Sequence, residues 1–194
     1  VAKYLVENGY DVKVISCANQ SLSDNLPLEI PSQRVEYTSW LNVNSPIVFL
    51  LGKKKVAAKG FVPASSHLPS WIQNLGYHYR NLLNYPDGQI GWYPFAMRAG
   101  DRLIKKWRPD LIFSSASPYS SLLVASALSR KHNIPWIAEL RDLWVDNHNN
   151  IVPAWRLYFE KILEHRTLSS ASGLVTVSDP LKEVLESKYS IPCK

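Results

Sequence analysis

The feature that most constrains the fold is a pair of apolar segments, each of which ends in a polar cluster. Residues 109–121 end in a Ser-rich turn, and residues 135–144 end in a stretch that contains Arg141 and Asp142. The residues between them have a helical pattern, so the two segments are predicted to be parallel strands joined by a helix. Ligands of open α/β sheets bind beyond the carboxyl ends of the strands. We therefore expect the Ser-rich turn and the neighbouring residues Arg141 and Asp142 to face one cleft.

The same alternation of strand and helix patterns continues along much of the chain. Strands are predicted at residues 11–17, 34–38, 110–115, 135–140 and 173–177, and helices at residues 1–9, 67–83, 92–107, 119–131, 153–170 and 179–188. This alternation predicts an α/β fold, a Rossmann-like doubly wound parallel sheet with helices on both faces. We expect residues 1–194 to form one such domain, with a helical, aromatic insertion at about residues 40–90. Because the chain opens within a helix, whereas such folds open with a strand, we expect the domain to be truncated at its N-terminus.

The composition is that of a globular protein, with 46% hydrophobic and 20% charged residues, and it excludes a disordered chain. The longest apolar run, residues 46–51, is far shorter than the roughly 20 residues that a membrane span needs. The N-terminal residues do not have the pattern of an export signal. Cys17 and Cys193 match no metal or disulfide spacing, which is typical of a reducing compartment. We therefore expect a cytoplasmic protein.

The net charge of +6 favours anionic partners, because clustered cations attract them over long distances. Lysines cluster at residues 53–55, 59 and 105–106. Nucleic acid, anionic lipid and phosphorylated sugars all carry the required charge, and a solvated basic face without a partner is equally consistent with each cluster. The chain contains no recognisable recognition helix or RNA-binding aromatic motif, so nucleic acid is not the expected partner.

Four segments resemble the N-terminal domain of a family 4 glycosyltransferase of the GT-B type. The resembling segments are residues 87–94, 108–118, 135–144 and 171–178, and they occur in the family's order and spacing. The resemblance extends over about residues 84–190 and, more loosely, over residues 1–17. It implies one half of a GT-B fold, in which the N-terminal domain receives the acceptor and the C-terminal domain holds most of the nucleotide-sugar.

The resemblance implies a glycosyltransferase of the hexosyltransferase type. Such an enzyme moves a sugar from a nucleotide-diphosphate sugar to a glycan or a lipid-linked acceptor in surface polysaccharide synthesis, without a metal or other cofactor. Its C-terminal domain is a further partner, so residues 1–194 alone are expected to be inactive. The basic, aromatic residues 45–83 suggest peripheral contact with an anionic membrane, at the inner face of the plasma membrane. The alternative is a non-catalytic α/β binding module whose basic patch holds an anionic partner.

Within this resemblance, Asp142 is the candidate catalytic residue, because it follows a buried strand where the family places polar groups on the acceptor side. Its carboxylate could take the proton of the acceptor hydroxyl or orient that hydroxyl. Alternatively, Asp142 caps the following turn or pairs with Arg141. Arg141 itself could bind a phosphate or carboxylate through its bidentate guanidinium, or form an ordinary surface ion pair. Glu139 is a weaker candidate, because it is predicted to face a neighbouring helix.

The remaining candidates for acceptor or donor binding are Ser115, Ser117, Tyr119 and Trp144. The serine hydroxyls and the free N–H groups of the helix that begins near Tyr119 could bind sugar hydroxyls or phosphate. Ordinary capping by Ser117, with Pro118 in the first helical position, explains part of this pattern equally well. Trp144 could stack on a sugar ring or belong to the core. His148, His165 and Asp146 lack the spacing of a metal site, so we expect no metal.

Overall fold

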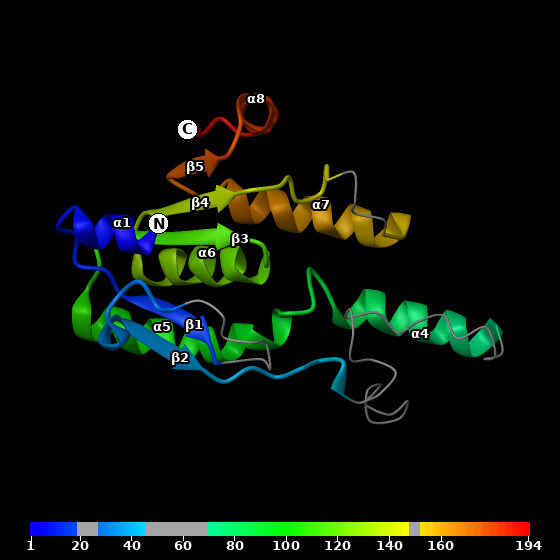
Figure 1. Cartoon of the computed structure of the whole chain (residues 1–194). Helices are drawn as coiled ribbons and strands as arrows, with labels where there is room; N and C mark the ends of the chain where they lie inside the picture. The colour runs from blue at the N-terminus through cyan, green and yellow to red at the C-terminus, as the bar shows by residue number, and fades with distance from the viewer. Residues whose placement is uncertain (19–26, 46–69, 148–151) are drawn as a thin grey trace.

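The computed structural model describes residues 1–18, 27–45, 70–147 and 152–194. Strands alternate with helices and every strand pair in these residues is parallel, so the predicted α/β fold is confirmed (Figure 1). The elements are α1 (Ala2–Glu7), β1 (Val14–Cys17), a 3₁₀ turn (Ser32–Arg34), β2 (Val35–Thr38), α4 (Ser70–Leu83), a second 3₁₀ turn (Ile90–Trp92), α5 (Tyr93–Trp107), β3 (Ile112–Ala116), α6 (Ser120–His132), β4 (Trp136–Leu140), α7 (Ala154–Leu168), β5 (Gly173–Thr176) and α8 (Asp179–Lys188). Residues 46–69 of the predicted insertion, including the three consecutive lysines, lie outside the described residues.

The strands form two sheets where the sequence pattern predicts one. β1 pairs with β2, and β4 lies between β3 and β5. In the central strand β4, the successive residues Ala138, Glu139 and Leu140 are all buried, which explains why this segment is almost continuously apolar. Beyond α8 the chain returns to the sheet, where Cys193 pairs with Leu174 of β5.

Helix α5 joins the smaller sheet to the rest of the molecule. Its C-terminal Trp107 donates from Nε1 to Asp11 Oδ2 at 2.7 Å, and Trp92, just before the helix, donates from Nε1 to Thr38 Oγ1 at 2.6 Å. On the α6 side, a Cβ added to Gly100 would lie 2.3 Å from Leu128 Cδ1, so a larger residue would require the Leu128 side chain to move. Figure 1 shows α5 beside β1 and β2, below α6.

The main core lies between β4 and the helices α6, α7 and α8. It contains Trp136 and Leu140 from β4 together with Leu122, Leu168 and Leu185 from the three helices, all of them almost fully buried. The indole Nε1 of Trp136 donates to Ser170 O at 2.8 Å, so even its polar atom is satisfied inside the core. This packing holds the carboxyl ends of the strands in fixed positions.

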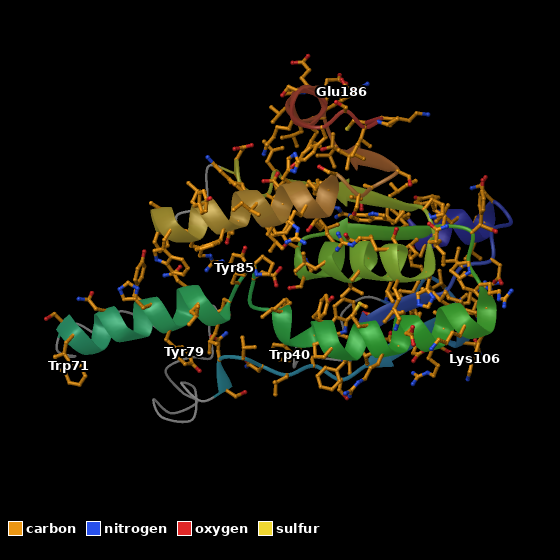
Figure 2. The ribbon with its side chains drawn as sticks, turned by 180° about the vertical axis from the view of Figure 1, so that it is seen from behind. Trp40, Trp71, Tyr79, Tyr85, Lys106 and Glu186 are labelled. Atoms are coloured by element: carbon orange, nitrogen blue, oxygen red, sulfur yellow. The ribbon has the colours of Figure 1, made fainter. Side chains whose placement is uncertain are left out.

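Helices α4 and α7 project together from the end of the molecule toward which β3, β4 and β5 point (Figure 1). The buried Arg156 of α7 pairs with Glu160 at 2.6 Å and donates to the carbonyl oxygens of Asn81, Asn84 and Pro86. Tyr85, which lies between the two helices in Figure 2, donates to Phe159 O at 2.8 Å. One buried cation therefore fastens the end of α4 and the following turn to α7.

Candidate functional site

The structure brings the two predicted polar clusters to neighbouring positions at one sheet edge. Ala116 at the end of β3 is paired with Leu140 at the end of β4, and α6 connects the two strands as predicted. Arg141 and Asp142 are exposed directly after Leu140. On the β3 side, Ser117 is exposed and Ser115 is half-buried.

The backbone on either side of Asp142 is held by hydrogen bonds. Thr176 donates from Oγ1 to Leu140 O at 2.8 Å, and Tyr119 donates from its hydroxyl to Leu143 O at 3.0 Å. The Asp142 side chain itself is exposed between these two anchors. A carboxylate on a fixed backbone is positioned to meet a substrate group without reorganising the loop.

Tyr119 and Trp144 stack on each other, with ring centroids 4.7 Å apart and planes inclined by 4°. Trp144 is only 1% exposed, so it contributes by holding the 141–147 loop against α6. Burial, aided by the negative charge of Asp142, raises the pKa of Tyr119 to about 12. The tyrosine therefore stays protonated near neutral pH and continues to donate to the loop.

The far end of the same loop is tied to α7 and α8 by a charged cluster. Lys188 Nζ lies 2.7 Å from Asp146 Oδ2 and 3.1 Å from Glu164 Oε1. Glu164 is almost completely buried, and burial raises its pKa although the Lys188 charge acts in the opposite direction. The loop that carries Asp142 is thus fixed at both ends.

The N-terminus of α6 is capped by a residue that the sequence patterns did not indicate. Asp87 accepts hydrogen bonds from the backbone N–H and the hydroxyl of Ser120, both at 2.7 Å. The expectation that Ser117 caps this helix is wrong: Tyr119 is the N-cap residue, no N-cap side chain bonds to the helix, and Ser117 is exposed. Because a carboxylate already occupies this helix end, an anionic ligand would be repelled there. Asp87 is 33 positions from Ser120, beyond the range of a local capping pattern.

We expect the Asp87→Ala variant to lose about 1–2 kcal/mol of unfolding free energy, because the Ser120 N–H and hydroxyl lose their acceptor. Urea unfolding followed by circular dichroism measures this loss. Asp110→Ala is the matched control, since Asp110 is exposed two residues before β3, and it should change stability by no more than about 0.5 kcal/mol. Equal stability of the two variants would show that the cap contributes nothing.

Glu139 is buried in β4, and its Oε2 atom has no hydrogen-bond partner among the described residues. It is paired across the sheet with Ser115 of β3 and Val175 of β5, one residue before the strand ends. A buried carboxylate oxygen without a donor is costly, and such groups are retained where they have a functional partner. This unpaired oxygen is enclosed within the protein, a property that residue type and spacing alone did not reveal.

The residues described here form a polar site at the carboxyl ends of parallel strands. A comparison with known families shows what kind of protein carries it. The sequence model of glycosyltransferase family 4 matches residues 1–194. The chain belongs to glycosyltransferase family 4. No curated protein and no solved structure matches it. The resemblance seen in the four segments is therefore confirmed, and family membership supports glycosyl transfer in general, with a sugar donor and an acceptor as partners.

Two hollows of this family 4 chain are lined by described residues, and neither coincides with the polar sheet edge. One of about 320 Å³ lies between α5, α6 and α7, and another is lined by α1 and the residues that follow it. Within the described ranges, no group of three His, Cys, Asp or Glu side chains is placed to hold a metal ion. No described helix has both the length and the apolar character to cross a membrane. Ser117, Arg141 and Asp142 are exposed at the polar sheet edge.

Proposed function

We propose that this family 4 chain is the acceptor-binding part of an enzyme that moves a sugar from a nucleotide-diphosphate sugar to a glycan or a lipid-linked acceptor. The observation that carries the proposal is the exposed Asp142 carboxylate on a loop held by Tyr119 and Thr176. An open polar edge fits one half of a two-domain enzyme, in which the second domain closes the cleft and brings most of the donor site. We propose surface polysaccharide synthesis as the setting and hexosyl transfer as the reaction.

In the proposed reaction, the Asp142 carboxylate takes the proton of the acceptor hydroxyl. The acceptor oxygen attacks the anomeric carbon, the bond from that carbon to the diphosphate breaks, and the nucleoside diphosphate leaves with the electron pair. Arg141, exposed beside Asp142, offers a bidentate guanidinium to a phosphate or carboxylate. No step requires a metal.

The test is a transfer assay on the intact protein that contains this chain. A panel of nucleotide-diphosphate sugars is supplied with glycan and lipid-linked acceptors, and release of nucleoside diphosphate is measured with and without acceptor, in the presence of EDTA. Acceptor-dependent release from at least one donor is the expected result. If no donor is consumed, while an anionic ligand binds with an affinity that falls steeply with salt, the non-catalytic binding module is the correct function.

A further inference from the structure

Helix α7 has an unusual distribution of side chains, because it buries charges and exposes aromatic rings. Arg156, Glu160 and Glu164 are at most 7% exposed. On the opposite face lies a stripe of four large apolar residues, 40–62% exposed: Trp155, Tyr158, Phe159 and Ile162, which we call the α7 stripe. Its spacing of three and four residues places all four on one side of the helix. None of these four side chains belongs to the described hydrophobic core.

Helix α4 exposes large apolar residues of its own, and its end packs on the Arg156 face of α7, opposite the stripe. Its residues Trp71, Tyr77 and Leu82 are also exposed, and Figure 2 shows Trp71 at the far end of the helix. The two helices project from the same end of the molecule in both views and are fastened to each other by Arg156 (Figures 1 and 2). The four apolar side chains of the α7 stripe, gathered on one exposed helix face, mark an interaction site.

The charges on these two helices identify the kind of partner. α4 contains no acidic residue, and the two acidic residues of α7, Glu160 and Glu164, are both buried. Lys161 and Arg166 are exposed on α7. The outward surface therefore combines aromatic rings with positive charge and carries no exposed carboxylate from either helix.

We propose that the α7 stripe docks on the surface of an anionic lipid bilayer. Tryptophan and tyrosine favour the interface between lipid and water, where the ring enters the apolar region and the polar atom remains hydrated. Basic residues beside them gain from the negative potential of anionic lipids. A second copy of this chain is the poorer occupant, because a symmetric contact would bring the Lys161 and Arg166 cations of both copies together.

The position of this surface also suggests how the acceptor is reached. This step of the inference rests on the proposed function. α4 and α7 project from the end toward which the strands point, and the Asp142 loop lies at that same end (Figure 1). Docking would bring the polar sheet edge close to the bilayer surface. An acceptor anchored in lipid would then present its hydroxyl near Asp142 without leaving the membrane.

Vesicle flotation of the intact protein tests the surface directly. The vesicles are phosphatidylcholine with or without phosphatidylglycerol, and the variant replaces all four residues of the α7 stripe by Ser. We expect its partition onto anionic vesicles to fall by about tenfold or more, because the apolar area that enters the interface is lost. The matched control replaces Tyr4, Tyr37 and Val177, which are equally exposed elsewhere, and should float like the wild type. The Lys161→Glu/Arg166→Glu variant should lose its preference for anionic vesicles.

Three results would overturn this inference. The stripe variant could float at the wild-type level, or the control variant could lose as much flotation as the stripe variant. The third result is a wild-type protein that binds no vesicles and forms a dimer in ultracentrifugation, which the stripe substitutions dissociate. If the stripe variant unfolds at a lower temperature than the wild type, the charge-reversed variant decides the outcome. Transfer to a water-soluble acceptor separates this inference from the proposed function. Transfer without flotation rejects the membrane surface alone, whereas stripe-dependent flotation without transfer rejects the transferase alone.

Discussion

The Asp142→Asn variant of the intact protein is expected to turn over about 100-fold more slowly than the wild type, or slower still, the effect of removing a general base. The amide has nearly the shape of the carboxylate but cannot take the acceptor proton. Because the Asp142 side chain is exposed and its flanking carbonyl groups are held by Thr176 and Tyr119, the substitution should leave the loop in place. Steady-state rates with the donor identified by the transfer assay give kcat and KM separately, and the loss should appear in kcat.

Asp146→Asn is the matched control for this experiment. Asp146 is exposed in the same loop, four residues further along, and its carboxylate pairs with Lys188. Its replacement makes the same chemical change away from the proposed reacting group, so turnover should remain within about threefold of the wild type, as expected for an exposed ion pair. A near-normal rate for Asp142→Asn would make Asp142 a structural residue. Equal losses in both variants would assign the effect to the loop as a whole.

Replacing Arg156 by Leu should cost about 3–5 kcal/mol of unfolding free energy, the range for removing one partner of a buried ion pair. The guanidinium pairs with Glu160 and donates to the carbonyl oxygens of Asn84 and Pro86. Leucine supplies none of these bonds, and the Glu160 carboxylate would remain buried without this cation. Urea unfolding monitored by tryptophan fluorescence measures the loss.

Two further variants show whether the buried charge is the cause. Arg166→Leu makes the same substitution at an exposed position of α7 and should change stability by no more than about 0.5 kcal/mol. In the Arg156→Leu/Glu160→Leu double variant no Glu160 carboxylate remains buried, so it should recover part of the stability lost by Arg156→Leu alone. A loss below about 1 kcal/mol in the single variant would contradict the role of Arg156 as the fastening between α4 and α7.

The local elements were largely predictable from the sequence, because their side-chain periods are short. The predicted strand at residues 135–140 is β4, and the predicted helix at residues 92–107 is α5 to within one residue. Contacts between distant residues were not predictable. The cap of α6 joins Asp87 to Ser120, and the Arg156 bonds reach back 70 to 75 positions along the chain. Periodicity also predicts that α7 is a helix but not that its charged face is the buried one.

The same limit applies to the candidate site. The order of strands and helices was sufficient to place Arg141 and Asp142 beside the Ser-rich turn, because parallel neighbours end at a common edge. Residue type alone could not show that Trp144 is fully enclosed while Asp142, two positions earlier, is exposed. That difference depends on the stacking of Trp144 on Tyr119, a contact made across 25 positions of the chain.

The turn that follows α4 connects two parts of the molecule through adjacent residues. Pro86 is held from α7 by Arg156, and Asp87, the next residue, holds the first turn of α6 through Ser120. Only one peptide unit separates these two bonds, so the two contacts lie on adjacent residues. A series of hydrogen bonds therefore runs from the first turn of α7 to the start of α6, and from there through Tyr119 to the loop that carries Asp142. Direct contacts thus connect the end of the molecule that bears the exposed aromatic rings with the edge that bears the carboxylate.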